Sequence, residues 1–261
     1  MKKLIPSVLA MAALVSAAPP AGAQEEAPQL VSIGVLSVVP SQVEQFAEIV
    51  GKVVEAAKMS NLDAKHGWAT YQDGNDFHIV SWPENWAQLD DPNAFAREIG
   101  AGAGAELMQE AFGEFEELWV TSNSQMAVHV EEWSYMPEDG LQVGDHTGAV
   151  VFETWVRPGM NEEYSENTEA VMGLMSEIGY PYPIIGHRVA MGDENRTFFV
   201  VLHDGLGDFY GAKSFGALIE ASGIGESWSE VFEARSGLIY NNDSYQADWR
   251  QDLSYSGPDG Q

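Results

Sequence analysis

The sequence of 261 residues contains no cysteine. Disulfide bonds, thiolate metal ligands and thiol nucleophiles are therefore excluded, because each of them needs a cysteine sulfur. Basic side chains are also few, with 12 Lys and Arg against 40 Asp and Glu and a formal net charge of −28. Nucleic acids and anionic lipid surfaces attract basic footprints, so the composition argues against both as partners.

The acidic side chains are scattered along the chain and do not form one cluster. A scattered negative charge is typical of a surface that stays soluble in a salty medium. A cation store, or a docking face for a basic partner, is the alternative interpretation. Either of these would be favoured by clustered carboxylates, so solubility is the preferred explanation.

Long apolar runs are absent after the first residues of the chain. Two lysines precede an apolar run over residues 4–18, and small residues at 21–23 follow it. This order predicts a secretory signal peptide over residues 1–23, and the run is too short to be expected to span a membrane. We therefore expect a periplasmic or secreted protein without membrane insertion. Removal of Lys2 and Lys3 would leave 10 basic side chains against 40 acidic ones.

Sequence motifs for cofactors and metals are absent as well. The chain has no HExxH, no GxSxG and no GxxxxGK[ST]. Residues 100–105 fit a loose GxGxxA pattern, but they lie in a helical segment and do not follow a strand, as a dinucleotide site requires. We therefore expect no cofactor and no metal.

The chain contains an internal repeat with a spacing of about 120 residues. Three pairs of segments match in the same order, namely 40–46 with 158–164, 66–77 with 187–198, and 132–133 with 248–249. A repeat unit of this size is a domain and not one turn of a solenoid. The predicted organisation is a signal peptide (1–23), a linker (24–29), a first repeat (30–135), a linker (136–145), a second repeat (146–255) and a tail (256–261).

Each repeat is predicted to contain strand, helix, strand, strand, helix and strand. Apolar residues alternate over 31–39, which favours a strand, and then recur at helical spacing over 41–58. Turn-forming residues at 73–76 and 192–195 predict a hairpin in each repeat. Glycines at 100, 102 and 104, and at 223 and 225, predict that both second helices are broken in two.

This order is the ferredoxin-like arrangement, an antiparallel sheet with both helices on one face. The order, the Pro after strand one, the following Phe46 or Tyr164, and Trp82 in strand three resemble the dimeric α+β barrel superfamily, which includes monooxygenases of the antibiotic-biosynthesis type. The resemblance implies an α+β fold in which two tandem sheets form a barrel within one chain. The expected assembly is thus an intrachain pseudo-dimer that is monomeric. The superfamily includes cofactor-free oxygenases, haem proteins, isomerases and binding proteins, so the fold alone fixes no activity.

Two histidines are the predicted catalytic residues. His66 and His187 match in the repeat, and both are expected at the start of the second strand. An unperturbed histidine pKa near 6.5 suits a general base. The alternative is that both are half-exposed strand-end residues that the duplication copied.

Four further residues are predicted to line a pocket for a small apolar or aromatic molecule: Trp68, Trp82, Trp155 and His203. Trp155 and Glu153 are two residues apart and therefore share one face of the expected strand, which suggests a face that reaches water or a cavity. His203 takes the position of Trp82, so it could mark a pocket in one repeat only. The alternative for these aromatic residues is packing of helices on sheets.

Two functions of different classes follow from the sequence. The first is an exported protein that binds a small apolar or aromatic molecule, either as a ligand or as the substrate of a cofactor-independent monooxygenase or isomerase. The second is a non-catalytic scaffold or stress-related interaction protein. A deep cavity reached by His66 or His187 would favour the first, and a barrel filled with apolar side chains would favour the second.

Overall fold

The computed structural model describes residues 29–91, 93–115, 118, 120–193 and 195–258. The predicted signal peptide, and all but the last residue of the linker predicted over 24–29, lie outside the described residues. Within the described part, no helix is both long and apolar enough to cross a membrane.

Both repeats have the predicted order of elements. The first consists of β1 (Leu30–Val38), α1 (Val43–Met59), β2 (Trp68–Asp73), β3 (Asp76–Ser81), α2 (Ala94–Ala101), α3 (Ala105–Phe115) and β4 (Val120–Tyr135), with short 3-10 helices η1 (Pro40–Gln42), η2 (Ala64–His66) and η3 (Trp86–Asp90). The second consists of β5 (Gly148–Val156), α4 (Asn161–Glu177), β6 (Ile184–Met191), β7 (Arg196–His203), α5 (Leu206–Tyr210), α6 (Phe215–Ser222), α7 (Gly225–Leu238) and β8 (Ile239–Trp249), followed by η4 (Gln251–Leu253).

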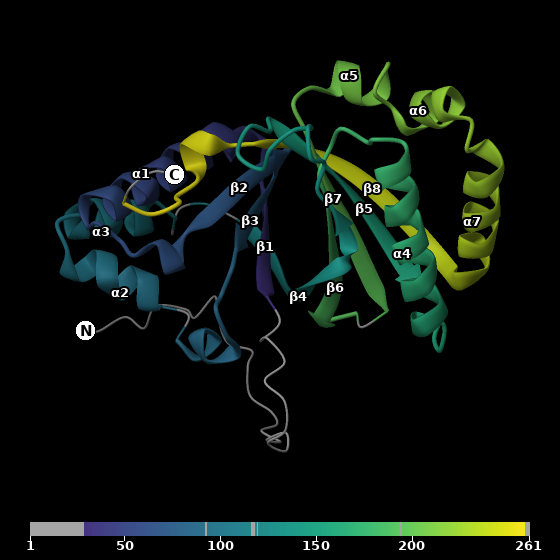
Figure 1. Cartoon of the computed structure of the whole chain (residues 1–261). Helices are drawn as coiled ribbons and strands as arrows, with labels where there is room; N and C mark the ends of the chain where they lie inside the picture. Colours follow the sequence, from purple (N-terminus) through teal and green to yellow (C-terminus); the bar gives the residue numbers. More distant parts are fainter. Residues whose placement is uncertain (1–28, 92, 116–117, 119, 194, 259–261) are drawn as a thin grey trace.

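The strands form one closed antiparallel barrel in the order β1-β3-β2-β8-β5-β7-β6-β4. Each repeat contributes four neighbouring strands, so the barrel closes at two seams between repeats. One seam, β4 with β6, is long, whereas the other, β2 with β8, has only the register pairs Tyr71 with Trp249 and Gln72 with Asp248. Helices α1 to α3 cover one side of the barrel, and α4 and α7 cover the other (Figure 1). This confirms the predicted intrachain α+β barrel.

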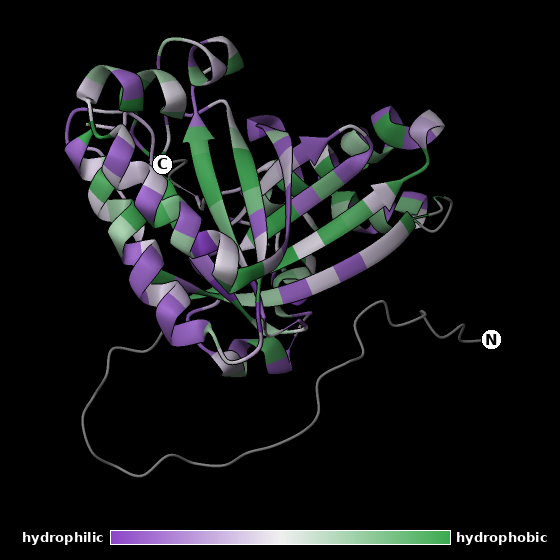
Figure 2. Ribbon diagram, turned by 90° about the vertical axis from the view of Figure 1, so that its right-hand side faces the viewer, coloured by the Kyte–Doolittle hydropathy of each residue, from purple (hydrophilic) through white to green (hydrophobic). Residues whose placement is uncertain are grey.

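Alternation along each strand separates two apolar layers. On β5, Val150 belongs to the core under helix α4, whereas Val151 belongs to a cluster inside the barrel. The interior cluster also contains Val189 and Phe198 from the same repeat. Some strands are mainly apolar whereas others carry polar stretches, and the outer helices carry apolar and polar stretches in turn (Figure 2). The barrel interior is therefore filled by side chains, and the space between sheet and helices is a separate layer.

The predicted breaks in the second helices are confirmed. In the first repeat, α2 ends at Ala101 and α3 begins at Ala105. The glycines between them allow close packing on α1, because a Cβ at Gly104 would lie 2.1 Å from the carbonyl oxygen of Ala56. In the second repeat, Gly223 ends α6 with φ of +77°, a left-handed conformation that favours glycine.

The chain returns to the first repeat after β8. The backbone N–H of Trp68 donates to the carbonyl oxygen of Tyr255 at 2.7 Å, and the N–H of Tyr255 donates to that of Trp68 at 2.9 Å. The Tyr255 hydroxyl donates to the carbonyl oxygen of Leu62 at 2.5 Å. The 3-10 helix η4 accordingly lies beside α1 (Figure 1). Residues 251–255, which the repeat pattern assigns to the second repeat, thus pack on the first.

Candidate functional site

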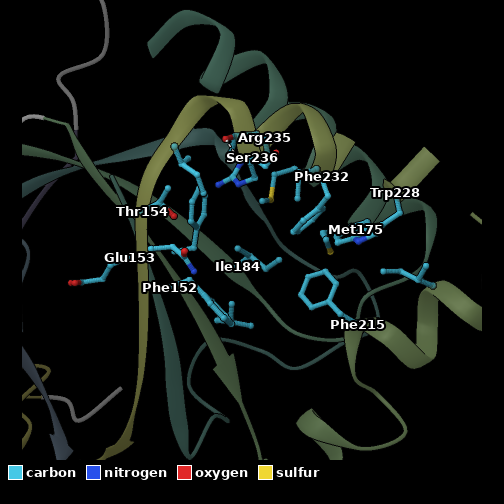
Figure 3. A pocket seen from close by; sticks show the side chains of 18 of the residues that line it. Phe152, Glu153, Thr154, Met175, Ile184, Phe215, Trp228, Phe232, Arg235 and Ser236 are labelled. Carbon is cyan, nitrogen blue, oxygen red and sulfur yellow. Dashed lines mark hydrogen bonds between the residues drawn. The ribbon is translucent and has the colours of Figure 1, made fainter. Parts of the chain in front are cut away.

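A cavity of about 560 Å³ lies in the second repeat, between the outer face of the sheet and helices α4, α6 and α7. Figure 3 shows side chains from the strands and from these helices converging on it. It is lined by Phe152, Glu153, Thr154, Thr168, Val171, Met172, Met175, Ile184, Phe199, Val201, Phe215, Gly216, Ile219, Trp228, Phe232, Arg235, Ser236, Ile239, Asn242 and Asp243. Its volume and mainly apolar lining are typical of sites for small organic molecules.

The corresponding layer of the first repeat is packed with aromatic rings. Phe46 lies 4.5 Å from Phe77 and 5.6 Å from Phe115, measured between ring centroids. Tyr164, which matches Phe46 in the repeat, instead directs its hydroxyl to the Thr197 hydroxyl at 2.9 Å. The layer between sheet and helices is therefore present in both repeats, but different side chains fill it in each.

One end of the cavity has aromatic walls. The Trp228 ring lies 5.4 Å from Phe215 of α6 and stacks on Phe232 of α7 with centroids 4.6 Å apart. Phe215 in turn stacks on the buried ring of Tyr180 at 4.5 Å. Such faces bind aromatic and aliphatic molecules by burying their apolar surface, at about 25 cal/mol per Å².

The wall formed by α4 and α7 carries a basic side chain, Arg235. Its Nη1 donates to the Thr168 hydroxyl at 3.1 Å and to Asn167 Oδ1 at 3.3 Å, and its Nη2 donates to the Tyr164 hydroxyl at 2.7 Å. The guanidinium carbon lies 4.5 Å from the centre of the Tyr164 ring and 5.6 Å from that of Phe199. These contacts hold the half-buried guanidinium in one place at the cavity.

Two acidic residues belong to the lining, but neither pairs with Arg235. Glu153 forms an ion pair with Arg196 at 3.5 Å, and Figure 3 shows its side chain pointing away from the other labelled side chains. Asp243 Oδ1 accepts a hydrogen bond from the N–H of Ser244 at 2.8 Å. Among the described residues, Arg235 forms no ion pair with a carboxylate.

The lining does not fit haem, a cofactor found in the superfamily that the sequence resembles. Haem iron takes an axial ligand from His, Cys or Tyr, or from Met together with His. Met172 and Met175 line the cavity, but His, Cys and Tyr are not among its lining residues. In the described parts of the chain, no group of three or more His, Cys, Asp or Glu could hold a metal ion.

The structure does not bring the two predicted catalytic histidines together. His66 lies in η2, before β2 begins, and its Nε2 is 3.1 Å from Glu98 Oε1 of α2. His187 lies in the middle of β6, is 5% exposed and stacks on the interior residue Phe198 at 4.7 Å. One is therefore in the helix layer of the first repeat and the other inside the barrel. Neither lines the cavity.

The expected equivalence of these two positions is wrong for a geometric reason. Ten residues (188–197) separate His187 from its partner Phe198 in the second hairpin, and ten residues (70–79) separate Ala69 from its partner Val80 in the first. Ala69, and not His66, is thus the counterpart of His187. The match by sequence is shifted by three residues, and an odd shift along a strand exchanges its two faces.

The four predicted pocket residues lie elsewhere in the fold. Trp68 donates from Nε1 to the carbonyl oxygen of Leu253 at 2.8 Å, and Trp82 is 45% exposed after β3. Trp155 donates from Nε1 to Asp193 Oδ2 at 2.8 Å. His203 is buried, and the centre of its ring lies 5.6 Å from that of Phe209. None of these four is a lining residue of the second-repeat cavity.

The residues that line the cavity on α7 have a recognisable spacing. Trp228, Phe232 and Arg235 recur along α7 at intervals of four and three residues. This spacing places them on one face of a helix. An arginine within an otherwise apolar face is the sequence signal that would have indicated this site.

Burial of His187 makes a pH dependence of stability predictable. Desolvation, with a smaller effect of the charge of His129, lowers the pKa of His187 to about 3. In the unfolded chain its pKa is near 6.5, so the unfolded state binds a proton first as the pH falls. The contribution of neutral His187 to the unfolding free energy is therefore complete above pH 6.5 and is lost progressively as the pH falls towards 3.

We expect this histidine to steepen acid destabilisation of the protein. Between pH 6 and pH 4, the wild type should lose roughly 2–3 kcal/mol more unfolding free energy than His187→Leu, at about 1.4 kcal/mol per pH unit. Urea unfolding at a series of pH values measures both curves. Parallel curves would show that His187 takes up its proton equally in the folded and unfolded states.

Comparison with known proteins supports the fold. No protein-family model matches the chain, and no curated protein matches its sequence. Among solved structures, a candidate monooxygenase from Lactobacillus acidophilus NCFM is similar with a TM-score of 0.53 and 11% identity, covering 88% of this chain and 97% of that one. A candidate monooxygenase from Fusobacterium nucleatum has a TM-score of 0.54 and 10% identity, covering 86% and 93%. An anthrone oxidase-like protein has a TM-score of 0.53 and 12% identity, covering 86% and 91%. At these identities the similarity establishes the α+β barrel fold and not an activity.

Proposed function

We propose that this protein binds a small apolar or aromatic molecule in the cavity of the second repeat. The observation that carries the proposal is a partly open cavity of about 560 Å³ with aromatic walls and one fixed basic group. Sites for small molecules combine such an apolar lining with a few well-placed polar groups. The pattern of residues 1–23 supports the further proposal that binding takes place in the periplasm or outside the cell.

Cofactor-independent oxygenation or isomerisation of the bound molecule is a second candidate function. The description of two structural neighbours as candidate monooxygenases, and of a third as anthrone oxidase-like, favours it. The positions of His66 and His187 away from the cavity do not support a mechanism in which either acts as its base. Binding is for this reason the preferred proposal.

A purely structural role is the remaining alternative from the sequence. The apolar cluster inside the barrel, with Val151, Val189 and Phe198, is what a scaffold would show. The cavity, however, lies outside the barrel wall, between sheet and helices. A filled barrel and a ligand site are therefore compatible in this fold.

Filling the cavity tests the proposal. Val171 of α4 and Val201 of β7 are buried and both line the cavity. We expect Val171→Phe with Val201→Phe to weaken binding of the neutral fluorescent probe N-phenylnaphthylamine at least tenfold, about 1.4 kcal/mol. Fluorescence titration gives the Kd. A wild-type protein that does not bind the probe, or a double variant that binds it as tightly, would refute the proposal.

A neighbouring valine provides the control. Val150 pairs with Val201 across β5 and β7 and is equally buried, but it does not line the cavity. We expect Val150→Phe to lower the unfolding free energy by about 1–3 kcal/mol, because no space receives the larger ring. Probe binding to the folded fraction should persist. The double variant should be destabilised less, since its rings enter existing space.

A further inference from the structure

We propose that Arg235 is the anchor for an anionic group, so that the ligand of this cavity is a small amphiphile with an apolar body and one carboxylate-like group. The inference rests on the proposed function and specifies the chemical class of ligand. Among the residues that the structure describes, Arg235 is the only basic one that lines the cavity.

The guanidinium has donors to spare. It carries five N–H groups, and three are used by the contacts with Asn167, Thr168 and Tyr164. One N–H on Nε and one on Nη2 remain outside these contacts. Arginine binds carboxylates through two parallel hydrogen bonds, and such bonds are stronger than those between neutral groups. Two donors at a fixed position match one carboxylate-like group.

The electrostatic surroundings also favour an external anion. The chain has 40 acidic side chains, yet none in its described part forms an ion pair with Arg235. Its partners are neutral oxygens and the faces of two aromatic rings. A half-buried charge without a counter-charge is costly to keep, and a bound anion would supply the missing partner.

The lining orients such a ligand. Phe215, Trp228 and Phe232 form the apolar wall on α6 and α7, and Arg235 lies about one helical turn beyond Phe232 on α7. Figure 3 shows Arg235 apart from the labelled Phe215 and Trp228. An apolar body against the rings would therefore place its anionic end at Arg235.

Two probes with nearly the same ring system separate the effect of an anionic group on affinity from the effect of the apolar body. Anilinonaphthalenesulfonate carries a sulfonate, whereas N-phenylnaphthylamine is its neutral counterpart. We expect Arg235→Gln to lower the ratio of sulfonate-probe affinity to neutral-probe affinity at least tenfold. An unchanged ratio would overturn the anion site and leave the proposed function standing. Failure of both probes to bind the wild type would instead refute the proposed function.

A matched control and a second measurement complete the test. Arg188→Gln removes the same charge from an exposed position in β6 that does not line the cavity, and its ratio should equal that of the wild type. If Arg235→Gln does not fold, phenylglyoxal labelling of the wild type replaces it, with peptide mass spectrometry as the readout. The sulfonate probe should protect Arg235 at least fivefold and Arg188 not at all. Equal protection of both would overturn the inference.

Discussion

Tyr255→Ala should lower the unfolding free energy by about 3–5 kcal/mol, as truncation of a large buried aromatic residue does. Tyr255 is 2% exposed and packs in a core of the first repeat, although it follows the last strand of the second. Its ring lies 5.5 Å from that of Trp68. The substitution removes this packing and leaves the carbonyl oxygen of Leu62 without its hydrogen bond. Urea unfolding followed by tryptophan fluorescence measures the loss.

Tyr255→Phe is the matched control for this residue. It keeps the ring and removes only the hydroxyl that donates to Leu62, so we expect a loss of about 1–2 kcal/mol. The short seam between β2 and β8 leaves residues 251–255 as a main connection between the repeats on that side. A loss below about 1 kcal/mol for Tyr255→Ala would contradict this role of the C-terminal residues.

Gly104→Ala should destabilise the first repeat by roughly 3 kcal/mol or more, although it adds a single methyl group. The new Cβ would lie 2.1 Å from the carbonyl oxygen of Ala56, and its next neighbours are also backbone atoms of Ala56. No side chain can rotate away, so helix α3 must move from α1. That movement would also strain the hydrogen bond from the Gly104 N–H to Ser60 Oγ, which is 2.9 Å long.

Gly113 is the control for this substitution, because it lies within helix α3, which begins directly after Gly104, and nothing lies within 4 Å of its added Cβ. Gly113→Ala should raise stability by up to about 1 kcal/mol, since alanine favours the helix more than glycine does. Thermal unfolding of both variants measures the difference. Equal melting temperatures would show that the close approach of α1 and α3 is not required by the fold.

The architecture was predictable because its signals are local. Alternation over 31–39, the turn residues at 73–76 and the helix-breaking glycines each act within a few residues of chain, and the repeat showed them twice. The barrel was implied by the resemblance of both repeats to the dimeric α+β barrel superfamily. The crossing of residues 251–255 to the first repeat was not predictable, because it depends on contacts such as that of Tyr255 with Leu62, far apart in sequence.

The candidate site was less predictable for two physical reasons. Identical residues suggested that His66 and His187 are equivalent, but a shift of three residues in strand pairing places them in different layers. The cavity itself depends on how far α6 and α7 lie from the sheet, which no local pattern encodes. A role for Arg235 was not predictable from its residue type, because a single arginine in a helix is usually a solvated surface residue.

Native mass spectrometry with N-phenylnaphthylamine measures ligand binding to the second repeat directly, because it counts the molecules bound to each chain and reports the oligomeric state together. We expect a monomer with one probe molecule on the wild type and none on Val171→Phe with Val201→Phe. A wild-type chain that remains bare, or equal binding to both proteins, would contradict the assignment of ligand binding to the cavity of the second repeat.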